Sequence, residues 1–323
     1  MKYLVTGGAG YIGSIVATML LEEGHEVVVL DDCSTGNAER VPAGATLVRK
    51  SVQQADQVLD ATFDGVLHFG GLIAAGESME KPEIYWEANT AATFALLGAM
   101  RAVNVRTLVF SSTAAVYGNP TEVPIKEEAA KAPTSTYGAS KLASDMAIQS
   151  EATAHGLAAV SLRYFNVVGA YQDQSGLWHG ENHEPETHII PIAFDAASGA
   201  RDSFGLFGED YPTPDGTCVR DYIHVADLAD AHLLALKAAE AGEHKIYNLG
   251  NGNGFSNKEV VATVKRVTGV DFPVEIGPRR AGDPAELVAS SERAKNELGW
   301  KPSRDSLDRM VADAWEYYQH ARR

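Results

Sequence analysis

Tyr137 and Lys141 are the two residues whose types and spacing most directly suggest chemistry. Four positions apart on a helix, they would share one face and lie close enough to interact. A nearby ammonium favours the phenolate, so the lysine would move the tyrosine pKa from about 10 toward the working pH. Such a side chain can take a proton from a carbinol oxygen and return it. Of the 12 tyrosines, only Tyr137 has a lysine at this spacing, and the alternative is an ordinary contact on a helix surface.

Hydroxyl residues end the apolar run that precedes this pair. Ser111, Ser112 and Thr113 follow a buried-type strand that begins at Thr107. In open α/β sheets, ligands bind at the carboxyl edge of the strands. We therefore expect a hydroxyl from this group to reach the same substrate oxygen as Tyr137; the alternative for each is capping of the strand end.

A glycine-rich turn near the N-terminus predicts a dinucleotide site. Gly7, Gly10 and Gly13 lie between a strand and a helix, which allows a tight turn, close approach to a pyrophosphate and close helix packing. The next predicted strand ends at Asp31, where an acidic side chain would bind the adenosine ribose. Asp31 and Asp32 would repel a 2′-phosphate, so the sequence favours NAD over NADP as cofactor.

Short β-branched runs alternate with helical patterns in the first half of the chain. The predicted strands are 3–6, 27–31, 66–69, 107–111 and 158–163, and the predicted helices are 12–23, 85–103 and 137–155. Continuous apolar strands suit a parallel sheet covered on both faces, and the alternation predicts βαβ units. The expected fold class is α/β, a Rossmann-type doubly wound parallel sheet with a smaller, discontinuous C-terminal substrate lobe.

The composition and pattern of the sequence change after about residue 164. Residues 171–187 are rich in Gly, His, Asn, Glu and Pro, which predicts a long loop over a site. A helix is expected over 225–241, another begins at Ser256 with the capping-box spacing to Glu259, and 245–249 could add a strand to the first sheet. We expect an NAD-binding domain over 1–165, completed by segments near 220–250, and a mainly substrate-binding lobe over 166–323.

Composition limits the possible partners. The formal charge is −16, from 27 basic and 43 acidic residues, which argues against nucleic-acid or anionic-membrane binding. Cys33 and Cys218 are too few for a disulfide framework and have no metal-ligand spacing. With no signal peptide and no run of about 20 apolar residues, the cytoplasm is the expected location.

The motifs together resemble the extended short-chain dehydrogenase/reductase superfamily and, within it, the UDP-galactose 4-epimerase family. The superfamily pattern is a Ser or Thr with Tyr-x-x-x-Lys over a GxxGxxG Rossmann domain. The resemblance to the epimerase family extends nearly from end to end and is carried by residues 5–14, 68–69, 76–78, 116–118, 137–141, 163–166, 219–225, 247–250 and 279–283.

This resemblance implies a role for each matching residue. Tyr137 would be the base on the 4-hydroxyl, Lys141 would hold the nicotinamide ribose, and Thr113 would be the hydroxyl partner. The implied cofactor-binding residues are Gly7, Gly10, Tyr11, Ile12, Gly13, Asp31, Asp32, Ser34, Thr35, Gly36, Ser51, Val52, Phe69, Gly70, Gly71, Ile73, Asn89, Ser111, Tyr137, Lys141 and Phe165. The implied substrate-binding residues are Thr113, Tyr137, Asn166, His188, Leu206, Phe207, Arg220, Tyr222, Arg280, Asp283 and Leu287.

The implied reaction is an NAD-dependent interconversion of UDP-galactose and UDP-glucose: a hydride leaves C4, the 4-keto sugar rotates, and the hydride returns to the other face. Arg220 and Arg280 would grip the diphosphate, since a guanidinium pairs bidentately with phosphate oxygens. The alternative for Arg220 is an ion pair with Asp221 or another neighbour. The resemblance also implies a homodimer formed through helices 85–103 and 137–155.

Several positions depart from the family pattern. Thr113 stands where many relatives have serine, Ile73 replaces a lysine of some members, and Ser51-Val52 replaces an Asp-Ile pair. His188 stands where some relatives place an asparagine on the substrate. Leu287 replaces a bulky tyrosine of some relatives, so UDP-N-acetylhexosamines are possible additional substrates.

Other reactions were weighed against these residues. Sugar-nucleotide dehydratases carry an acidic pair after the Ser/Thr, whereas this chain has Ala114-Ala115. A decarboxylase or another nucleotide-sugar epimerase stays open, as does a non-enzymatic NAD-sensing protein, although such proteins usually lose the Tyr/Lys pair. No metal is expected, because His179, His183 and His188 lack the HExxH order of a metal hydrolase.

Overall fold

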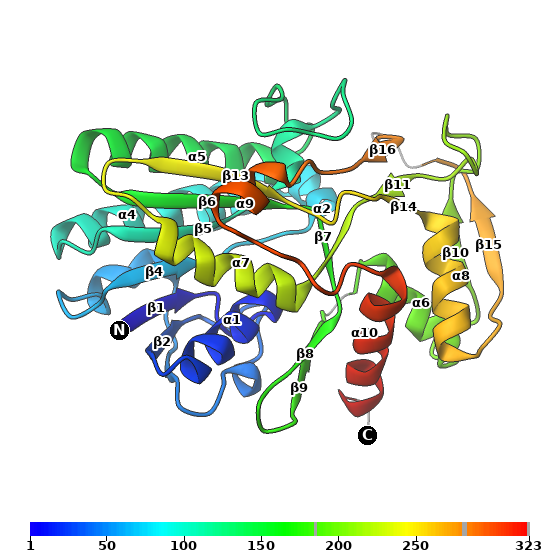
Figure 1. The fold of residues 1–323 in the computed structure, drawn as a ribbon, viewed down its shortest axis with the longest axis horizontal. Coiled ribbons are helices and arrows are strands. Elements are labelled where there is room, and N and C mark those ends of the chain that lie inside the picture. Colours follow the sequence, from blue (N-terminus) through cyan, green and yellow to red (C-terminus); the bar gives the residue numbers. More distant parts are fainter. Residues whose placement is uncertain (184–185, 280–282, 322–323) are drawn as a thin grey trace.

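A seven-stranded parallel sheet forms the centre of the molecule (Figure 1). The computed structural model describes residues 1–183, 186–279 and 283–321. The strands of the sheet are β1 (Lys2–Thr6), β2 (Glu26–Leu30), β3 (Thr46–Val48), β4 (Gly65–His68), β5 (Thr107–Thr113), β6 (Ala158–Tyr164) and β13 (His244–Leu249). Their order is β13-β6-β5-β4-β1-β2-β3. The chain therefore winds outward in both directions from β1, as predicted for a doubly wound fold.

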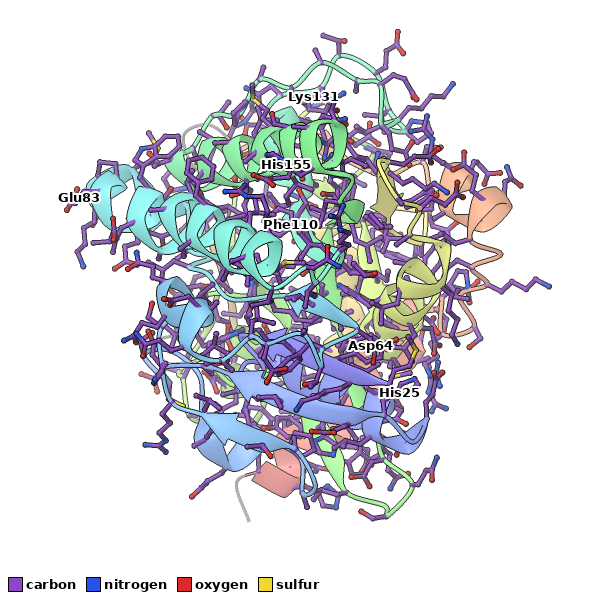
Figure 2. The ribbon with its side chains drawn as sticks, turned by 90° about the vertical axis from the view of Figure 1, so that its left-hand side faces the viewer. His25, Asp64, Glu83, Phe110, Lys131 and His155 are labelled. Atoms are coloured by element: carbon purple, nitrogen blue, oxygen red, sulfur yellow. The ribbon has the colours of Figure 1, made fainter. Side chains whose placement is uncertain are left out.

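Helices cover both faces of this sheet. On one face α1 (Tyr11–Glu22) and α7 (Val225–Ala238) bury their apolar sides against β1 and β2 in a shared core. On the other face α4 (Ala92–Ala102) and α5 (Thr136–His155) pack side by side over the sheet, with Phe110 of β5 beneath them (Figure 2). Because all strands of the sheet are parallel, the loops that lead from a strand to the next helix all lie at its carboxyl edge. This brings the loops of the predicted site together.

The later part of the chain has a core of its own. Its helices α6 (Ile189–Ala197), α8 (Asn257–Thr268) and α10 (Leu307–Ala321) pack with the parallel pair β10 (Phe204–Phe207) and β15 (Val274–Gly277). The remaining short strands are β7 (Asn166–Val168), β8 (Ala170–Gln172), β9 (Trp178–Gly180), β11 (Val219–Arg220), β12 (Tyr222–His224), β14 (Phe255–Ser256) and β16 (Glu286–Leu287). The remaining short helices are η1 (Ala38–Arg40), η2 (Val52–Gln57), α2 (Ala75–Glu80), α3 (Pro82–Tyr85), η3 (Trp86–Ala91), η4 (Ala114–Tyr117) and α9 (Glu292–Glu297).

Most predicted elements are confirmed within a few residues. The late strand does join the first sheet, where β13 pairs with β6. Ser256 and Glu259 form the capping box at the start of α8. In the described residues, no helix is both long and apolar enough to cross a bilayer.

Two predictions differ from the structure. The single helix expected over 85–103 is three segments, because a π-helical turn, η3, separates α3 from α4. The loop expected over 171–187 begins with an antiparallel hairpin of β8 and β9. The spacing of apolar residues does not distinguish a π-helical turn from the α-helix around it. The strands of the hairpin have three residues each, which is too short for a recognisable alternation.

Candidate active site

The glycine-rich turn between β1 and α1 is shaped by close backbone contacts. Gly7 has a φ of +70°, and a Cβ there would meet the Gly70 nitrogen at 2.5 Å. A Cβ on Gly13 would overlap the Gly7 carbonyl oxygen, so helix and turn can pack this closely only without side chains. Gly10 caps α1 without any side-chain acceptor, and no acidic residue lies in its first turn. The first amides of the helix thus remain available to a pyrophosphate, which fits NAD.

Asp31 ties the end of β2 to this turn. Its carboxylate accepts from the Ala9 amide at 2.9 Å and from the Cys33 amide at 2.8 Å. The side chain is thereby fixed at the carboxyl edge of the sheet, beside the glycine turn, where a ribose hydroxyl is bound in this kind of fold. Asp32 is exposed, and its carboxylate accepts from the Ser34 amide at 2.9 Å.

The other predicted cofactor residues lie around the same edge. A Cβ on Gly36 would meet Ala9 at 3.0 Å, so the loop after β2 packs directly on the glycine turn. Val52 lies against Gly70, and the Ser51 hydroxyl caps η2. Tyr11 donates to the Gly169 carbonyl at 2.6 Å, while Ile73 is 48% exposed. Ile12 lies in the first turn of α1, and Thr35, Phe69 and Phe165 lie in loops that follow strands of the sheet. Ile12, Phe69 and Phe165 pack partly against the cores, and Thr35 is exposed.

Tyr137 and Thr113 are brought together. Tyr137 is the second residue of α5, and its amide donates to the Ser78 hydroxyl at 3.0 Å. Burial raises the pKa of Tyr137, and a hydrogen bond with the Thr113 hydroxyl partly lowers it again. Thr113 is buried at the end of β5, where its hydroxyl also accepts from the Ala115 amide at 3.1 Å. The pair is a proton donor and acceptor at the carboxyl edge of the sheet.

The position of Lys141 corrects part of the sequence interpretation. Its ammonium donates to the Ser111 carbonyl at 3.1 Å and lies over the Phe110 ring, 5.0 Å from its centroid. The expected lowering of the Tyr137 pKa by this ammonium is not found, because the lysine is directed to the β5 carbonyl. Burial lowers the pKa of Lys141 to about 8, while the charge of Asp145 acts in the opposite direction.

Asn89 completes the wall next to this lysine. Its amide accepts from the Leu72 N–H at 2.8 Å and donates to the Leu72 carbonyl at 3.1 Å and to the Ser140 hydroxyl at 3.0 Å. A Cβ on Gly71 would lie 2.6 Å from the Asn89 oxygen and 3.5 Å from the Lys141 ammonium. The π-helical turn η3 carries Asn89, which agrees with the frequent occurrence of such turns at functional sites.

Sequence reasoning missed a buried polar network beneath these residues. Arg163 and Asp145 form a salt bridge at 2.8 Å, and Ser112 donates to the same carboxylate at 3.1 Å. Tyr164 shares a hydrogen bond with Ser111, whose carbonyl accepts from Lys141. The only sequence signal was that Asp145 lies one helical turn after Lys141, a spacing that is common on helices.

Three of the residues expected to hold the nucleotide sugar, Asn166, Arg220 and Leu287, lie on β7, β11 and β16. Asn166 donates its side-chain amide to the Asp221 carbonyl at 3.1 Å. Leu287 pairs with Arg220 in the sheet and packs partly against a small apolar cluster that includes Val116 and Tyr117. These segments meet between the main sheet and the second core.

Arg220 is not engaged by Asp221. The Asp221 carboxylate accepts from the amides of Ala289 at 2.9 Å and Asn251 at 2.8 Å, and from Gly252 at 3.0 Å. The Arg220 guanidinium donates to the Val219 carbonyl at 2.9 Å, and no carboxylate of residues 1–183, 186–279 or 283–321 forms an ion pair with it. The guanidinium therefore keeps its charge for an anionic ligand.

Five further substrate-binding predictions have less direct support in the structure. Leu206 and Tyr222 both lie in the second core, so a contact from either to a ligand would come from the backbone. Phe207, the next residue on β10, is 37% exposed. Asp283 is exposed, and Arg280 lies outside the described residues.

His188 caps the start of α6 within a charged loop. Its Nδ1 lies 2.5 Å from Glu181 and 3.6 Å from Glu186. Although burial opposes it, the Glu181 carboxylate raises the pKa of His188 to about 9. His183 joins the same group, 3.2 Å from Glu181.

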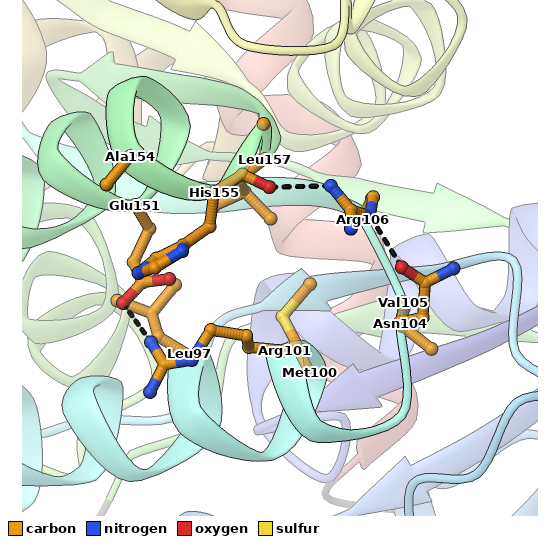
Figure 3. A pocket seen from close by; sticks show the side chains of 11 residues that line it. Leu97, Met100, Arg101, Asn104, Val105, Arg106, Glu151, Ala154, His155 and Leu157 are labelled. Carbon is orange, nitrogen blue, oxygen red and sulfur yellow. Dashed lines mark hydrogen bonds and ion pairs between the residues drawn. The ribbon is translucent and has the colours of Figure 1, made fainter.

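A cavity of about 430 Å³ lies elsewhere, between the carboxyl ends of α4 and α5 (Figure 3). Arg101 pairs with Glu151 across it, and Arg106 donates to the Asn104 side chain and the His155 carbonyl at 2.6 Å each (Figure 3). None of the predicted catalytic or ligand-binding residues lines this cavity, so cavity volume is a poor guide to the site here.

The doubly wound sheet, the glycine turn and the Thr113–Tyr137 pair with Lys141 define an NAD-dependent enzyme that acts on an alcohol or carbonyl carbon. Residues 3–250 match the family described as "NAD dependent epimerase/dehydratase family", and the chain belongs to this family.

Individual relatives are similar over almost the whole chain. It is 55% identical to a UDP-glucose 4-epimerase of Corynebacterium glutamicum over 319 residues, which cover 98% of this chain and 95% of the relative. A UDP-glucose 4-epimerase structure from Bifidobacterium longum, in complex with NAD⁺ and UDP, has a TM-score of 0.91 at 36% identity, covering 99% of this chain and 98% of that one. A UDP-Glc/GlcNAc 4-epimerase structure from Campylobacter jejuni has a TM-score of 0.85 at 36% identity and covers 99% of both chains.

Proposed function

We propose that the protein interconverts UDP-galactose and UDP-glucose, with NAD as a retained cofactor. The observation that carries this proposal is the Tyr137 phenol beside the Thr113 hydroxyl, with Lys141 one helical turn farther along α5. The similarity to UDP-glucose 4-epimerases over nearly the full length supports the substrate and the reaction. Because the hydride removed from C4 would be returned within the same turnover, the reaction would have no net redox change.

Each residue has a distinct part in this reaction. Tyr137, as phenolate, takes the proton of the 4-hydroxyl and later returns it, while the Thr113 hydroxyl holds the same oxygen in place. Lys141 and Asn89, which lie side by side next to β5, would bind the nicotinamide ribose. NAD bound there would supply the acceptor and then the donor of the C4 hydride.

The sugar must turn while the nucleotide stays bound. Arg220, whose charge is not neutralised by a described carboxylate, supports a firm grip on the diphosphate. Phe207 and Leu287 offer few directional hydrogen bonds to a hexose, so they would permit its rotation. We propose the same gripping role for Arg280.

The direct test is to incubate purified protein with UDP-galactose, without added NAD, and to measure UDP-glucose by chromatography. Conversion is expected to reach the same equilibrium from either sugar nucleotide, because retained NAD is regenerated in every turnover. No conversion, even with NAD added and with UDP-N-acetylgalactosamine or UDP-xylose offered, would contradict the 4-epimerase proposal.

Leu287 favours a second group of substrates, the UDP-N-acetylhexosamines. Its side chain is smaller than a tyrosine, and the similar structure from Campylobacter jejuni is titled a UDP-Glc/GlcNAc 4-epimerase. Leu287→Tyr is expected to lower kcat/KM for UDP-N-acetylglucosamine strongly while sparing UDP-galactose. If Leu287→Tyr keeps full activity on the N-acetylated sugar, this residue does not set the size of the pocket.

We further propose a homodimer that forms through α4 and α5. Phe94 of α4 is 52% exposed and Met146 of α5 is 65% exposed, and such apolar side chains are typical of an interface. Sedimentation is expected to give a dimer for the native chain and a monomer for Phe94→Glu with Met146→Glu. A monomeric native chain would contradict this assembly.

The same proposal covers organisation and location. Residues 1–165, with β13 and α7, would form the NAD-binding domain, and most of 166–323 the substrate lobe. The free thiols of Cys33 and Cys218 fit the reducing cytoplasm.

A further inference from the structure

The loop between β9 and α6 gathers four side chains of the kinds that bind metal ions. They are Glu181, His183, Glu186 and His188, called here the loop cluster, and one ligand atom from each lies within 4.8 Å of all the others. Two of the four follow β9 and two precede α6, with a spacing of two residues inside each pair. The hydride chemistry proposed above needs none of this arrangement.

The distances resemble the edges of a tetrahedral coordination shell. With metal–ligand bonds of about 2.0–2.2 Å, neighbouring ligands of a tetrahedral zinc ion lie roughly 3.3–3.6 Å apart. The His183 Nδ1 lies 3.2 Å from Glu181 and 3.8 Å from Glu186, and the His188 Nδ1 lies 3.6 Å from Glu186. Of these four imidazole–carboxylate distances, the 2.5 Å between His188 and Glu181 is the one that must widen to admit an ion.

The ligand atoms are shielded and already held in place. The Nδ1 atoms of His183 and His188 are both buried and make no hydrogen bond of good geometry, although carboxylates surround them. Glu186 accepts from the amides of Thr187 at 2.7 Å and His188 at 2.8 Å, which orients its carboxylate. The Glu181 side chain is only 8% exposed, so most of the cost of ordering these groups is met by the fold itself.

The cluster is also braced from outside. A Cβ on Gly180 would overlap the Tyr317 ring, so β9 is pressed against α10 immediately before Glu181. Arg40 donates to the Asn182 carbonyl at 3.3 Å and to the Tyr317 hydroxyl at 3.2 Å, which links the loop to η1 near the glycine turn. An ion bound here would fix the loop that joins the hairpin to α6.

We propose that the loop cluster is a structural site for one divalent transition-metal ion of the zinc type. Two imidazole nitrogens and two carboxylates suit zinc, whereas calcium and magnesium prefer shells made of oxygen. Two carboxylates also balance the charge of one divalent ion. The sequence interpretation expected no metal, because the histidines of this region lack the HExxH order; the loop cluster differs from that motif in order, in its two carboxylates and in its place on a loop.

The test uses the full-length, untagged protein, stripped with a chelator and then dialysed against Zn²⁺. One zinc per chain is expected by mass spectrometry, together with a melting temperature that rises with zinc concentration. His183→Asn with Glu186→Gln is expected to lose both effects. His179→Asn is the matched control, because His179 pairs with Asp173 in the neighbouring hairpin at 2.8 Å, and it should keep both.

Co²⁺ gives a second, spectroscopic readout. The stripped protein is expected to show the visible absorption of tetrahedral Co²⁺ in the native chain and in Cys33→Ser, which removes a thiol as the source. Substoichiometric zinc in the native chain, absence of the cobalt bands, or equal zinc in the double variant would each overturn the proposal. None of these readouts depends on epimerase activity, so a failure here leaves the proposed function untouched.

Discussion

At the scale of single residues, the site depends on burial more than on ion pairing. Burial raises the pKa of Tyr137 and lowers that of Lys141 to about 8, and the structure directs the lysine to the Ser111 carbonyl. Thr113 is therefore the group that acts directly on the phenol. The sequence predicted Tyr137, Lys141 and Thr113 as site residues. It did not predict that Lys141 bonds the Ser111 carbonyl, because that contact depends on the path of β5 beside α5.

Tyr137→Phe tests the base directly. The variant keeps the ring and the backbone bond to Ser78, so NAD content should be unchanged while kcat falls by roughly 10²–10⁴. Turnover and bound NAD are measured on the same preparation. Tyr247→Phe is the control, because the Tyr247 hydroxyl bonds Glu297 at 3.0 Å, away from the site, and native-like turnover is expected there. Undiminished turnover in Tyr137→Phe would remove this residue from the mechanism.

At the scale of elements, the glycine turn and α1 pack as one unit. Gly13→Ala would drive a Cβ into the Gly7 carbonyl, and overpacking of this kind costs about 1–3 kcal/mol. We expect a lower free energy of unfolding, measured with urea, and loss of copurifying NAD. Gly76→Ala in α2 meets nothing within 4 Å and should be neutral or stabilise by about 0.5–1 kcal/mol. Equal effects of the two substitutions would contradict the packing argument.

The elements also show why the sequence predicted some features and missed others. β1 and β4 are short apolar runs buried on both faces, which leaves a clear signal in the sequence. The π-helical turn η3 has no such signal, since its apolar spacing continues that of α4. The loop cluster was missed for a different reason: its spacing matches no metal-site motif, and the sequence does not show that its four side chains come together.

At the scale of the whole molecule, the free energy of unfolding depends on pH because two histidines are buried in their neutral form. His68 is buried in β4 between the hydroxyls of Thr6 at 2.6 Å and Thr93 at 3.1 Å. Burial, aided by the charge of Lys141, lowers the pKa of His68 to about 3. His232 of α7 is also buried, and burial lowers its pKa to about 4.

The sign of the resulting pH dependence follows from proton linkage. Below pH 6.5 the imidazoles take up protons in the unfolded chain but not in the folded chain. Their contribution to the free energy of unfolding is therefore intact above pH 6.5 and is lost as the pH falls. For His68, lowering the pH from 7 to 5 should remove about 2 kcal/mol. Other groups act in the opposite direction, such as Asp221, whose pKa burial raises to about 6.

His68→Gln isolates this contribution because every other group stays the same. We expect the variant to be less stable than the native chain at pH 7, yet to lose about 2 kcal/mol less between pH 7 and pH 5. Urea unfolding at both pH values, followed by circular dichroism, gives the double difference. His155→Gln, at an exposed position at the end of α5, should reproduce the native pH dependence. An unchanged pH dependence in His68→Gln would mean that His68 takes up a proton within the fold, which its buried position between two hydroxyls opposes.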